Sequence, residues 1–270
     1  MPTIGVFDSG VGGLSVLRAL LSALPGAHHI YLADSAYAPY GERSAADVLQ
    51  RSQRIVRHLR QIQPLDALVV ACNTATALAI DELRLCFPDL PIIGVEPALK
   101  PAAECSASGH VGVLATRATL GSARFAQLRQ RMEASSTRPL HFSCQPCDGL
   151  ADAIERDDET QTQALCERYV QALAQVPGPL PPMDTLVLGC THYPFAAPTL
   201  QTLCGPGVAL VETGPAVARR TRAVLGAALP ETDGHTQHAP MLLTTGSAEK
   251  LGATASRWLD TALSAQTVTI

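Results

Sequence analysis

Two stretches of this chain share one pattern, "LVVACNTATA" at residues 68–77 and "LVLGCTHYPF" at residues 186–195. Each runs from apolar residues through a small residue to a cysteine, which amide or hydroxyl side chains then follow. Short continuous apolar runs are typical of buried parallel strands, and the residues after the cysteine are of the kinds that begin helices. The pattern predicts two strand–cysteine–helix units in one α/β protein.

Short apolar strands and amphipathic helices alternate on both sides of these units. The first half predicts strands at "TIGVFD", "HIYLAD", "ALVVAC" and "PIIGVE", with a helix that Ser44 opens and Asp47 supports as a capping-box partner. The second half predicts strands at "HVGVLAT", "LHFSCQPC", "DTLVLGC" and "VALVETG", and "MLLTTGS" adds a last one. Helices are predicted over "RATLGSARFAQLRQRM" and from about residue 215 to 229, and "PETDGHTQHAP" is predicted to be a polar loop. Alternation of strands and helices favours parallel sheets.

The two halves of the chain also correspond to each other. "TIGVFDSGVGGLSVL" matches "HVGVLATRATLGSARF", and the two cysteine units match in the same order. We therefore predict two similar parallel-sheet α/β lobes with a pseudo-twofold relation and an active-site cleft between them. The first lobe is expected to hold residues 1–98 and about 211–270, and the second residues 99–210, with a hinge near residues 97–101.

Composition excludes several classes of function. The net charge of −4 and the absence of a run of Lys or Arg argue against a nucleic-acid partner. The first residues do not read as a secretory signal, and no apolar stretch approaches the ~20 residues that span a bilayer. We expect a cytoplasmic protein without a membrane partner, whose eight cysteines are free thiols, metal ligands or catalytic thiols.

Polar and reactive side chains gather where the predicted strands end, which is where parallel α/β sheets bind ligands. The segments concerned are residues 8–13, 34–43, 72–76, 116–119 and 190–192. Two facing lobes would set Cys72 and Cys190 on opposite walls of one cleft. Inverting a stereocentre by proton transfer needs a base on one face and an acid on the other, and a thiol serves in either role. Asp8 and His192 are candidate proton partners.

Other interpretations of these residues stay open. Either cysteine is also explained as a buried strand-end thiol, and Asn73 or Thr191 as a plain helix cap. "FDSGVGG" at residues 7–13 resembles half of a dinucleotide fingerprint, but Ser15 stands where that motif needs glycine. A nucleotide-binding module is one alternative. A zinc or redox protein built on Cys144 and Cys147 is another, although no second C-x-x-C accompanies them.

Five stretches together resemble the glutamate racemase family of cofactor-independent enzymes, which make D-glutamate for peptidoglycan. They are "IGVFDSGVGGLSVLRAL", "YLADSAYAPYGERS", "VVACNTATA", "VGVLATRATL" and "LVLGCTHYPF", in this order along most of the chain. The resemblance implies interconversion of L- and D-glutamate without pyridoxal phosphate or a metal. An aspartate racemase, or a related two-cysteine isomerase of the same superfamily, is the nearest alternative activity.

The resemblance also implies roles for matched residues. Cys72, assisted by Asp8, would act on the D-enantiomer, and Cys190, assisted by His192, on the L-enantiomer. A family glutamate corresponds to Glu155, favoured by its spacing from Cys147, or to Asp152. The residues implied to bind substrate are Asp8, Ser9, Tyr40, Gly41, Asn73, Thr74, Thr116, Thr119, Glu155, Thr191 and His192.

The resemblance finally implies partners besides glutamate. Members of the family commonly form homodimers. The stretch "GVEPALKPA" at residues 94–102 is similar to the proteobacterial members, some of which a UDP-linked peptidoglycan precursor activates. The sequence itself carries no sign of that activation.

Overall fold

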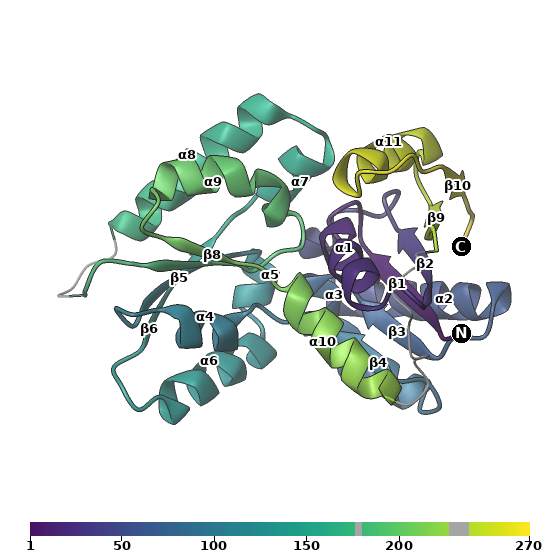
Figure 1. The fold of residues 1–270 in the computed structure, drawn as a ribbon, viewed down its shortest axis with the longest axis horizontal. Helices are drawn as coiled ribbons and strands as arrows, with labels where there is room; N and C mark the ends of the chain where they lie inside the picture. The colour runs from purple at the N-terminus through teal and green to yellow at the C-terminus, as the bar shows by residue number, and fades with distance from the viewer. Residues whose placement is uncertain (176–179, 227–237) are drawn as a thin grey trace. The chain divides into compact units, whose positions relative to one another are not determined.

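The computed structural model describes residues 1–175, 180–226 and 238–270, which form two compact units (Figure 1). The first unit joins Met1–Val95 to Gly214–Ile270, and the second is Glu96–Thr213. Each unit is built around its own sheet, and the strand pairings within both sheets are parallel.

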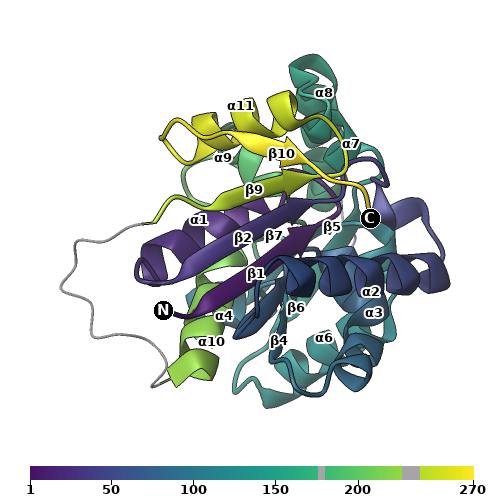
Figure 2. The same ribbon diagram turned by 90° about the vertical axis from the view of Figure 1, so that its right-hand side faces the viewer.

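The sheet of the first unit has the strand order β10-β9-β2-β1-β3-β4 (Figure 2). Its strands are β1 (Thr3–Asp8), β2 (His28–Ala33), β3 (Ala67–Val70), β4 (Ile92–Gly94), β9 (Met241–Thr244) and β10 (Ala265–Thr267). Its helices are α1 (Leu14–Ala23), the 3-10 turn η1 (Tyr40–Glu42), α2 (Ala45–Ile62), α3 (Asn73–Cys86), α10 (Gly214–Leu225) and α11 (Ala248–Trp258). The C-terminal strands thus complete the sheet that the N-terminal residues begin.

The sheet of the second unit has the order β6-β5-β7-β8. Its strands are β5 (His110–Ala115), β6 (His141–Pro146), β7 (Thr185–Leu188) and β8 (Ala209–Val211). Its helices are α4 (Leu99–Cys105), α5 (Arg117–Leu120), α6 (Ala123–Ser135), α7 (Leu150–Glu155), α8 (Glu159–Ala174) and α9 (Ala197–Cys204), with the 3-10 turn η2 (Tyr193–Ala196). Helices α8 and α9 lie on one face of the sheet, and α4 and α6 on the other (Figure 1).

The two sheets share a core topology, because β2-β1-β3-β4 and β6-β5-β7-β8 follow the same order. The prediction of two similar parallel-sheet lobes is therefore confirmed. In each unit the chain that leaves the third strand runs beside the end of the first. Ala71 donates its N–H to the Phe7 carbonyl at 2.7 Å, and Gly189 donates to the Leu114 carbonyl at 2.7 Å. The cysteine loop of each unit is anchored in this way.

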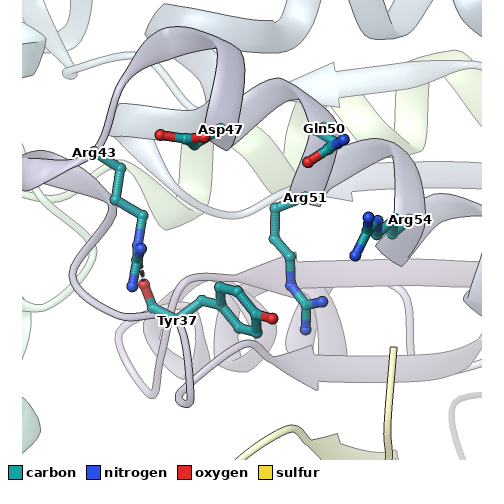
Figure 3. A pocket seen from close by; sticks show the side chains of 6 residues that line it. All are labelled: Tyr37, Arg43, Asp47, Gln50, Arg51 and Arg54. Atoms are coloured by element: carbon teal, nitrogen blue, oxygen red, sulfur yellow. Dashed lines mark hydrogen bonds between the residues drawn. The ribbon is translucent and has the colours of Figure 1, made fainter.

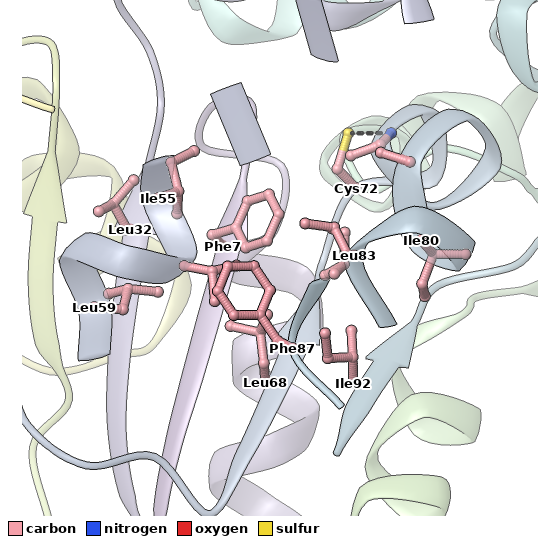
Figure 4. Packing of buried hydrophobic residues seen from close by; sticks show 14 of the residues in the cluster. Phe7, Leu32, Ile55, Leu59, Leu68, Cys72, Ile80, Leu83, Phe87 and Ile92 are labelled. Atoms are coloured by element: carbon pink, nitrogen blue, oxygen red, sulfur yellow. Dashed lines mark hydrogen bonds between the residues drawn. The ribbon is translucent and has the colours of Figure 1, made fainter. Parts of the chain in front are cut away.

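Apolar side chains between helices and sheet fix this geometry. In the first unit, Phe7 and Leu68 from the strands meet Ile55 and Leu59 of α2 and Leu83 of α3, and all five are fully buried (Figure 4). The four-residue spacing of Ile55 and Leu59 places both on the sheet-facing side of α2. Burial of one such side chain contributes about 1.5–3 kcal/mol.

Some elements differ from the sequence expectation. The single helix expected over "RATLGSARFAQLRQRM" is divided into α5 and α6, because the Ser122 hydroxyl accepts the N–H of Phe125 and starts a new helix. Helices α4 and α7 and the polar strand β10 were not expected, and the helix expected directly after Cys190 begins only at Ala197, as α9. The predicted polar loop "PETDGHTQHAP" lies mostly outside the described residues, as does the expected end of α10 near residue 229. In the part of the chain that is described, no helix is suited to crossing a bilayer.

Asp184 ties the loop before β5 to the start of β7. Its carboxylate accepts hydrogen bonds from the Ser106 hydroxyl at 2.6 Å and from the Ala107 and Ser108 amides at 2.7 and 2.6 Å. Partial burial alone would raise the pKa of Asp184, but these hydrogen bonds lower the pKa to about 2. The carboxylate therefore stabilises the second unit in its charged form.

We predict that Asp184→Asn lowers the free energy of unfolding by about 1–2 kcal/mol at neutral pH, a figure discounted for solvent screening. Because the folded pKa is depressed, this contribution is present above the unfolded value of about 4 and is lost as pH falls through the folded value. Urea unfolding of both proteins over this range measures it. The exposed Asp89, substituted by Asn, is the control and should change stability by under about 0.5 kcal/mol. An equal deficit at all pH values would contradict the assignment.

Candidate active site

In the first unit, Cys72 lies between β3 and α3 and itself caps the helix. Its Sγ accepts the N–H of Ala75 at 3.4 Å, and the residue is only 4% exposed (Figure 4). Asn73, one of the expected caps, is instead the first residue of α3. The thiol therefore stands at the positive end of a helix dipole, where negative charge on sulfur is favoured.

Asp8 lies at the end of the neighbouring strand β1 and is connected to Cys72 through Ser9. The Cys72 thiol donates to the Ser9 hydroxyl at 3.7 Å, and that hydroxyl donates to Asp8 Oδ1 at 3.4 Å. Asp8 Oδ2 accepts the Gly13 N–H at 2.6 Å. A Cβ on Gly13 would meet the Asp8 Cβ at 2.7 Å, so the close approach of this turn requires glycine. The glycine-rich stretch therefore holds a buried carboxylate in place.

The amide of Asn73 is also buried beside this thiol. Its Nδ2 donates to the Val95 carbonyl at 3.4 Å, while its Oδ1 accepts no hydrogen bond from the described residues although it is shielded from solvent. Buried polar atoms without a partner are uncommon in folded proteins. An oxygen of this kind is suited to accept a hydrogen bond from the ammonium group of an amino acid.

Tyr40 and Gly41 belong to the turn η1, which packs on α3. The Tyr40 hydroxyl donates to Asp34 Oδ2 at 2.6 Å, and the side chain is 1% exposed, whereas Gly41 is exposed. Burial, together with the Asp34 carboxylate, raises the pKa of the Tyr40 hydroxyl. Tyr40 is therefore a neutral donor that is already committed to Asp34.

In the second unit, Cys190 follows β7 and leads into the 3-10 turn η2 rather than into an α-helix. The Cys190 Sγ lies 3.8 Å from His192 Nδ1, and His192 Nε2 lies 2.7 Å from Glu155 Oε2. Asp152 instead pairs with Arg156 on the surface of α7. The structure thus brings Glu155, and not Asp152, to the histidine, and forms a thiol–imidazole–carboxylate row.

The pKa of His192 follows from these contacts. Burial alone would lower the pKa of the imidazole, but the hydrogen bonds with Cys190 and Glu155 outweigh burial and raise it well above its ordinary value. A protonated imidazole at neutral pH places a positive charge against the Cys190 sulfur. The sequence alone suggested His192 as a partner for Cys190. The fold adds that Glu155 of α7 holds His192 by a hydrogen bond.

Thr116 and Thr119 follow β5, the strand next to β7. Thr116 caps α5 by accepting the Thr119 N–H at 3.2 Å, and the two hydroxyl oxygens are 2.9 Å apart. Thr191 is buried between Cys190 and His192. These hydroxyls therefore belong to the same strand-end region as the second thiol.

The C-x-x-C pair divides between two hydrophobic clusters. Cys147 packs in the cluster with α7 and α8, and Cys144 packs against the cluster with α4 and α6. Each thiol donates to the carbonyl of the β6 residue two positions before it. Burial raises the pKa of both thiols. All eight cysteines are free. Within residues 1–175, 180–226 and 238–270, no three His, Cys, Asp or Glu side chains are grouped to hold a metal ion.

Each parallel α/β unit thus has a buried thiol after its third strand that contacts polar side chains of the same unit. The family model for Asp/Glu/hydantoin racemases matches residues 4–221, and this chain belongs to that family.

The chain is similar to glutamate racemases in particular. It is 50% identical to the one from Ectopseudomonas mendocina over 83% of this chain and 82% of the relative, and 48% identical to the one from Pseudomonas aeruginosa over the same shares. A glutamate racemase isoform from Bacillus anthracis has a TM-score of 0.86 at 29% identity, covering 100% of this chain and 98% of its own. The Escherichia coli glutamate racemase, solved with L-glutamate and the activator UDP-MurNAc-Ala, has a TM-score of 0.83 at 34% identity, covering 98% and 97%.

We predict that Glu155→Gln lowers the pKa of His192 by at least ~1 unit, because it removes the carboxylate that stabilises the imidazolium. NMR titration of the imidazole measures the change. A raised folded pKa stabilises the protein below the unfolded value and loses this effect as pH rises through the folded value. The stability deficit of the variant should therefore be largest on the acid side of about pH 6.5.

Asp152→Asn is the matched control, since it removes an acid from the same helix that pairs with Arg156 instead. It should leave the His192 titration unchanged. An equal shift in both variants would show that His192 senses the net charge of α7 rather than its contact with Glu155.

Proposed function

We propose that this protein interconverts L- and D-glutamate, with Cys72 and Cys190 as the two acid/base groups. The observation that carries the proposal is that each unit presents a buried thiol after its third strand with a separate proton partner, Ser9–Asp8 for Cys72 and His192–Glu155 for Cys190. Membership of the racemase family and near 50% identity to glutamate racemases support it.

In the L-to-D direction, the Cys190 thiolate removes the α-proton of L-glutamate while the Cys72 thiol donates its proton to the opposite face. The C–H bond of the substrate breaks toward one sulfur, a new C–H bond forms from the other, and the reverse direction exchanges the roles. A base and an acid of the same chemical type suit a reaction whose two directions are equivalent.

The carbanionic transition state needs stabilisation from fixed polar groups. We assign the Asn73 Oδ1 to the substrate ammonium, since that oxygen is buried without a partner among the described residues. The hydroxyls of Ser9, Thr74, Thr116, Thr119 and Thr191 and the Gly41 backbone are assigned to the carboxylates. Tyr40 contributes through the turn that it anchors, and no cofactor is assigned.

The biological setting follows from the same proposal. D-Glutamate formed in the cytoplasm would supply peptidoglycan synthesis, and a homodimer is the expected assembly. The activator bound to the Escherichia coli enzyme suggests that a UDP-linked peptidoglycan precursor also activates this protein. Racemisation assays with and without such a precursor test that part separately.

We predict that Cys72→Ala and Cys190→Ala each lower kcat/KM for racemisation by at least ~10³-fold, because each removes one of two required proton-transfer groups. Each variant should still exchange the α-proton of one enantiomer with deuterated water: D-glutamate for Cys190→Ala and L-glutamate for Cys72→Ala. Polarimetry and proton NMR measure the two processes.

Cys147→Ala is the matched control, since it removes another buried strand-end thiol. It should retain activity within about threefold, because Cys72 and Cys190 supply both of the required proton transfers. Full racemisation by either Cys72→Ala or Cys190→Ala would exclude the two-thiol mechanism.

We predict that glutamate is preferred over aspartate, with kcat/KM values that differ by about 10–200-fold, the discrimination that one methylene supplies. Parallel assays on L-glutamate and L-aspartate without added cofactor measure the ratio. A ratio that favours aspartate would assign the protein to the alternative activity of its family.

A further inference from the structure

Asp34 is a buried carboxylate at the end of β2, next to Asp8. Its backbone N–H donates to the Asp8 carbonyl at 2.9 Å, so the two acids end adjacent strands. Its carboxylate accepts four hydrogen bonds, two of them from Arg51 at 2.7 and 2.8 Å, one from Tyr40 at 2.6 Å and one from Thr245 at 2.9 Å. Every lone-pair site of Asp34 is therefore filled, and it is not available as a base.

Arg51 reaches Asp34 from α2 and is itself held on several sides. Its side chain is 6% exposed, its Nη1 donates to the Ile270 carbonyl at 2.6 Å, and its guanidinium lies 3.8 Å from the centre of the Tyr37 ring. A bidentate Arg–carboxylate pair fixes orientation as well as charge. Figure 3 shows the guanidinium beside Tyr37, at the wall of a surface pocket of about 100 Å³.

Tyr40 connects the Arg51–Asp34 pair to the surroundings of Cys72. Its ring belongs to the same buried cluster as Cys72 and as Val48 and Ile55 of α2, and the turn η1 contacts α3, which Cys72 caps. Negative charge on Cys72 contributes to the raised pKa of the Tyr40 hydroxyl, as expected for close neighbours. The row Arg51–Asp34–Tyr40 therefore runs from α2 to the turn η1, which contacts the helix that Cys72 caps.

We propose that Arg51 is a positioning residue for the Cys72 half of the site, acting through Asp34 on Tyr40 and the turn η1. This inference rests on the proposed function for its kinetic consequence. The guanidinium neutralises Asp34 and locks its orientation, and Asp34 in turn fixes the Tyr40 hydroxyl. Arg51 does not touch the reacting atoms. Arg51 keeps Cys72 and the turn η1 in the positions that the reaction needs. A displacement of 1 Å in such a site can cost about 100-fold in rate.

A double-mutant cycle tests the row. Arg51→Met and Tyr40→Phe should each lower kcat/KM for glutamate racemisation by about 10–100-fold. The double variant should be little worse than the more affected single variant, because both changes break one connection. Additive losses, or wild-type kinetics in a folded Arg51→Met variant, would overturn the proposal.

The chain offers a matched control in the same helix. Arg60 of α2 also makes a two-bond pair with a carboxylate, that of Asp89, but both side chains are exposed, at 38% and 61%. Arg60→Met should leave kcat and KM within twofold of the wild-type values. A loss equal to that of Arg51→Met would show that the helix, and not the buried row, is responsible.

Rescue separates positioning from general loss of structure. Arg51→Lys keeps the charge and should recover part of the activity. Arg51→Gln replaces Arg51→Met in the cycle if that variant does not fold. Arg51→Ala should leave a space that opens to the surface pocket, so millimolar guanidinium should raise its activity while leaving that of Arg60→Ala unchanged. Failure of both rescues would overturn the positioning role.

The alkylation rate of Cys72 can be measured without any racemisation. It therefore distinguishes failure of this inference from failure of the proposed function. At one pH, Arg51→Met should slow iodoacetamide labelling of Cys72 at least threefold, since it leaves unneutralised the charge of Asp34, which is hydrogen-bonded to Tyr40 of the Cys72 cluster. Arg51→Lys should restore the rate. Peptide mass spectrometry reads each thiol separately, and Cys190 should react at its wild-type rate. An unchanged Cys72 rate would overturn the inference even if racemisation is confirmed.

Discussion

Both thiol sites depend on the pairing of the third strand of each sheet with the first. The hydrogen bonds from Ala71 to Phe7 and from Gly189 to Leu114 continue that pairing one step past the strands. They place Cys72 beside the Asp8 turn, and Cys190 beside the Thr116 turn. Parallel strands end at the same edge, so a short loop after each strand is enough to gather polar groups there. The apolar clusters beneath hold the edge rigid.

The two thiols have equivalent positions but different surroundings. Cys72 caps a long α-helix and reaches a carboxylate through the Ser9 hydroxyl, whereas Cys190 precedes a 3-10 turn and contacts an imidazole backed by Glu155. The position after the second strand differs as well, since Asp34 follows β2 and Cys147 follows β6, each donating its N–H to the first strand of its sheet. One topology therefore supports two distinct electrostatic environments.

The sequence predicted the elements whose pattern is local. Apolar runs before Cys72 and Cys190 indicated buried strands, and Ser44 with Asp47 indicated a helix start that the structure confirms. It did not predict that Glu155 pairs with His192, because α7 returns to β7 across 37 residues. Nor did it separate Arg51 from the other arginines of α2, since only the folded sheet shows which one meets a buried carboxylate. Strand β10 was missed because "AQT" has neither apolar character nor alternation.

The cap formed by Cys72 joins the chemistry of the sulfur to the integrity of α3. The same sulfur that would exchange protons with a substrate also satisfies the N–H of Ala75 (Figure 4). A covalent inhibitor directed at this thiol would convert it to a bulky thioether, a much weaker acceptor, and leave the first turn of the helix without its cap. Modification there would loosen a structural element as well as block a reactive group, and an electrophile small enough to preserve the cap would leave the first unit closest to its native state.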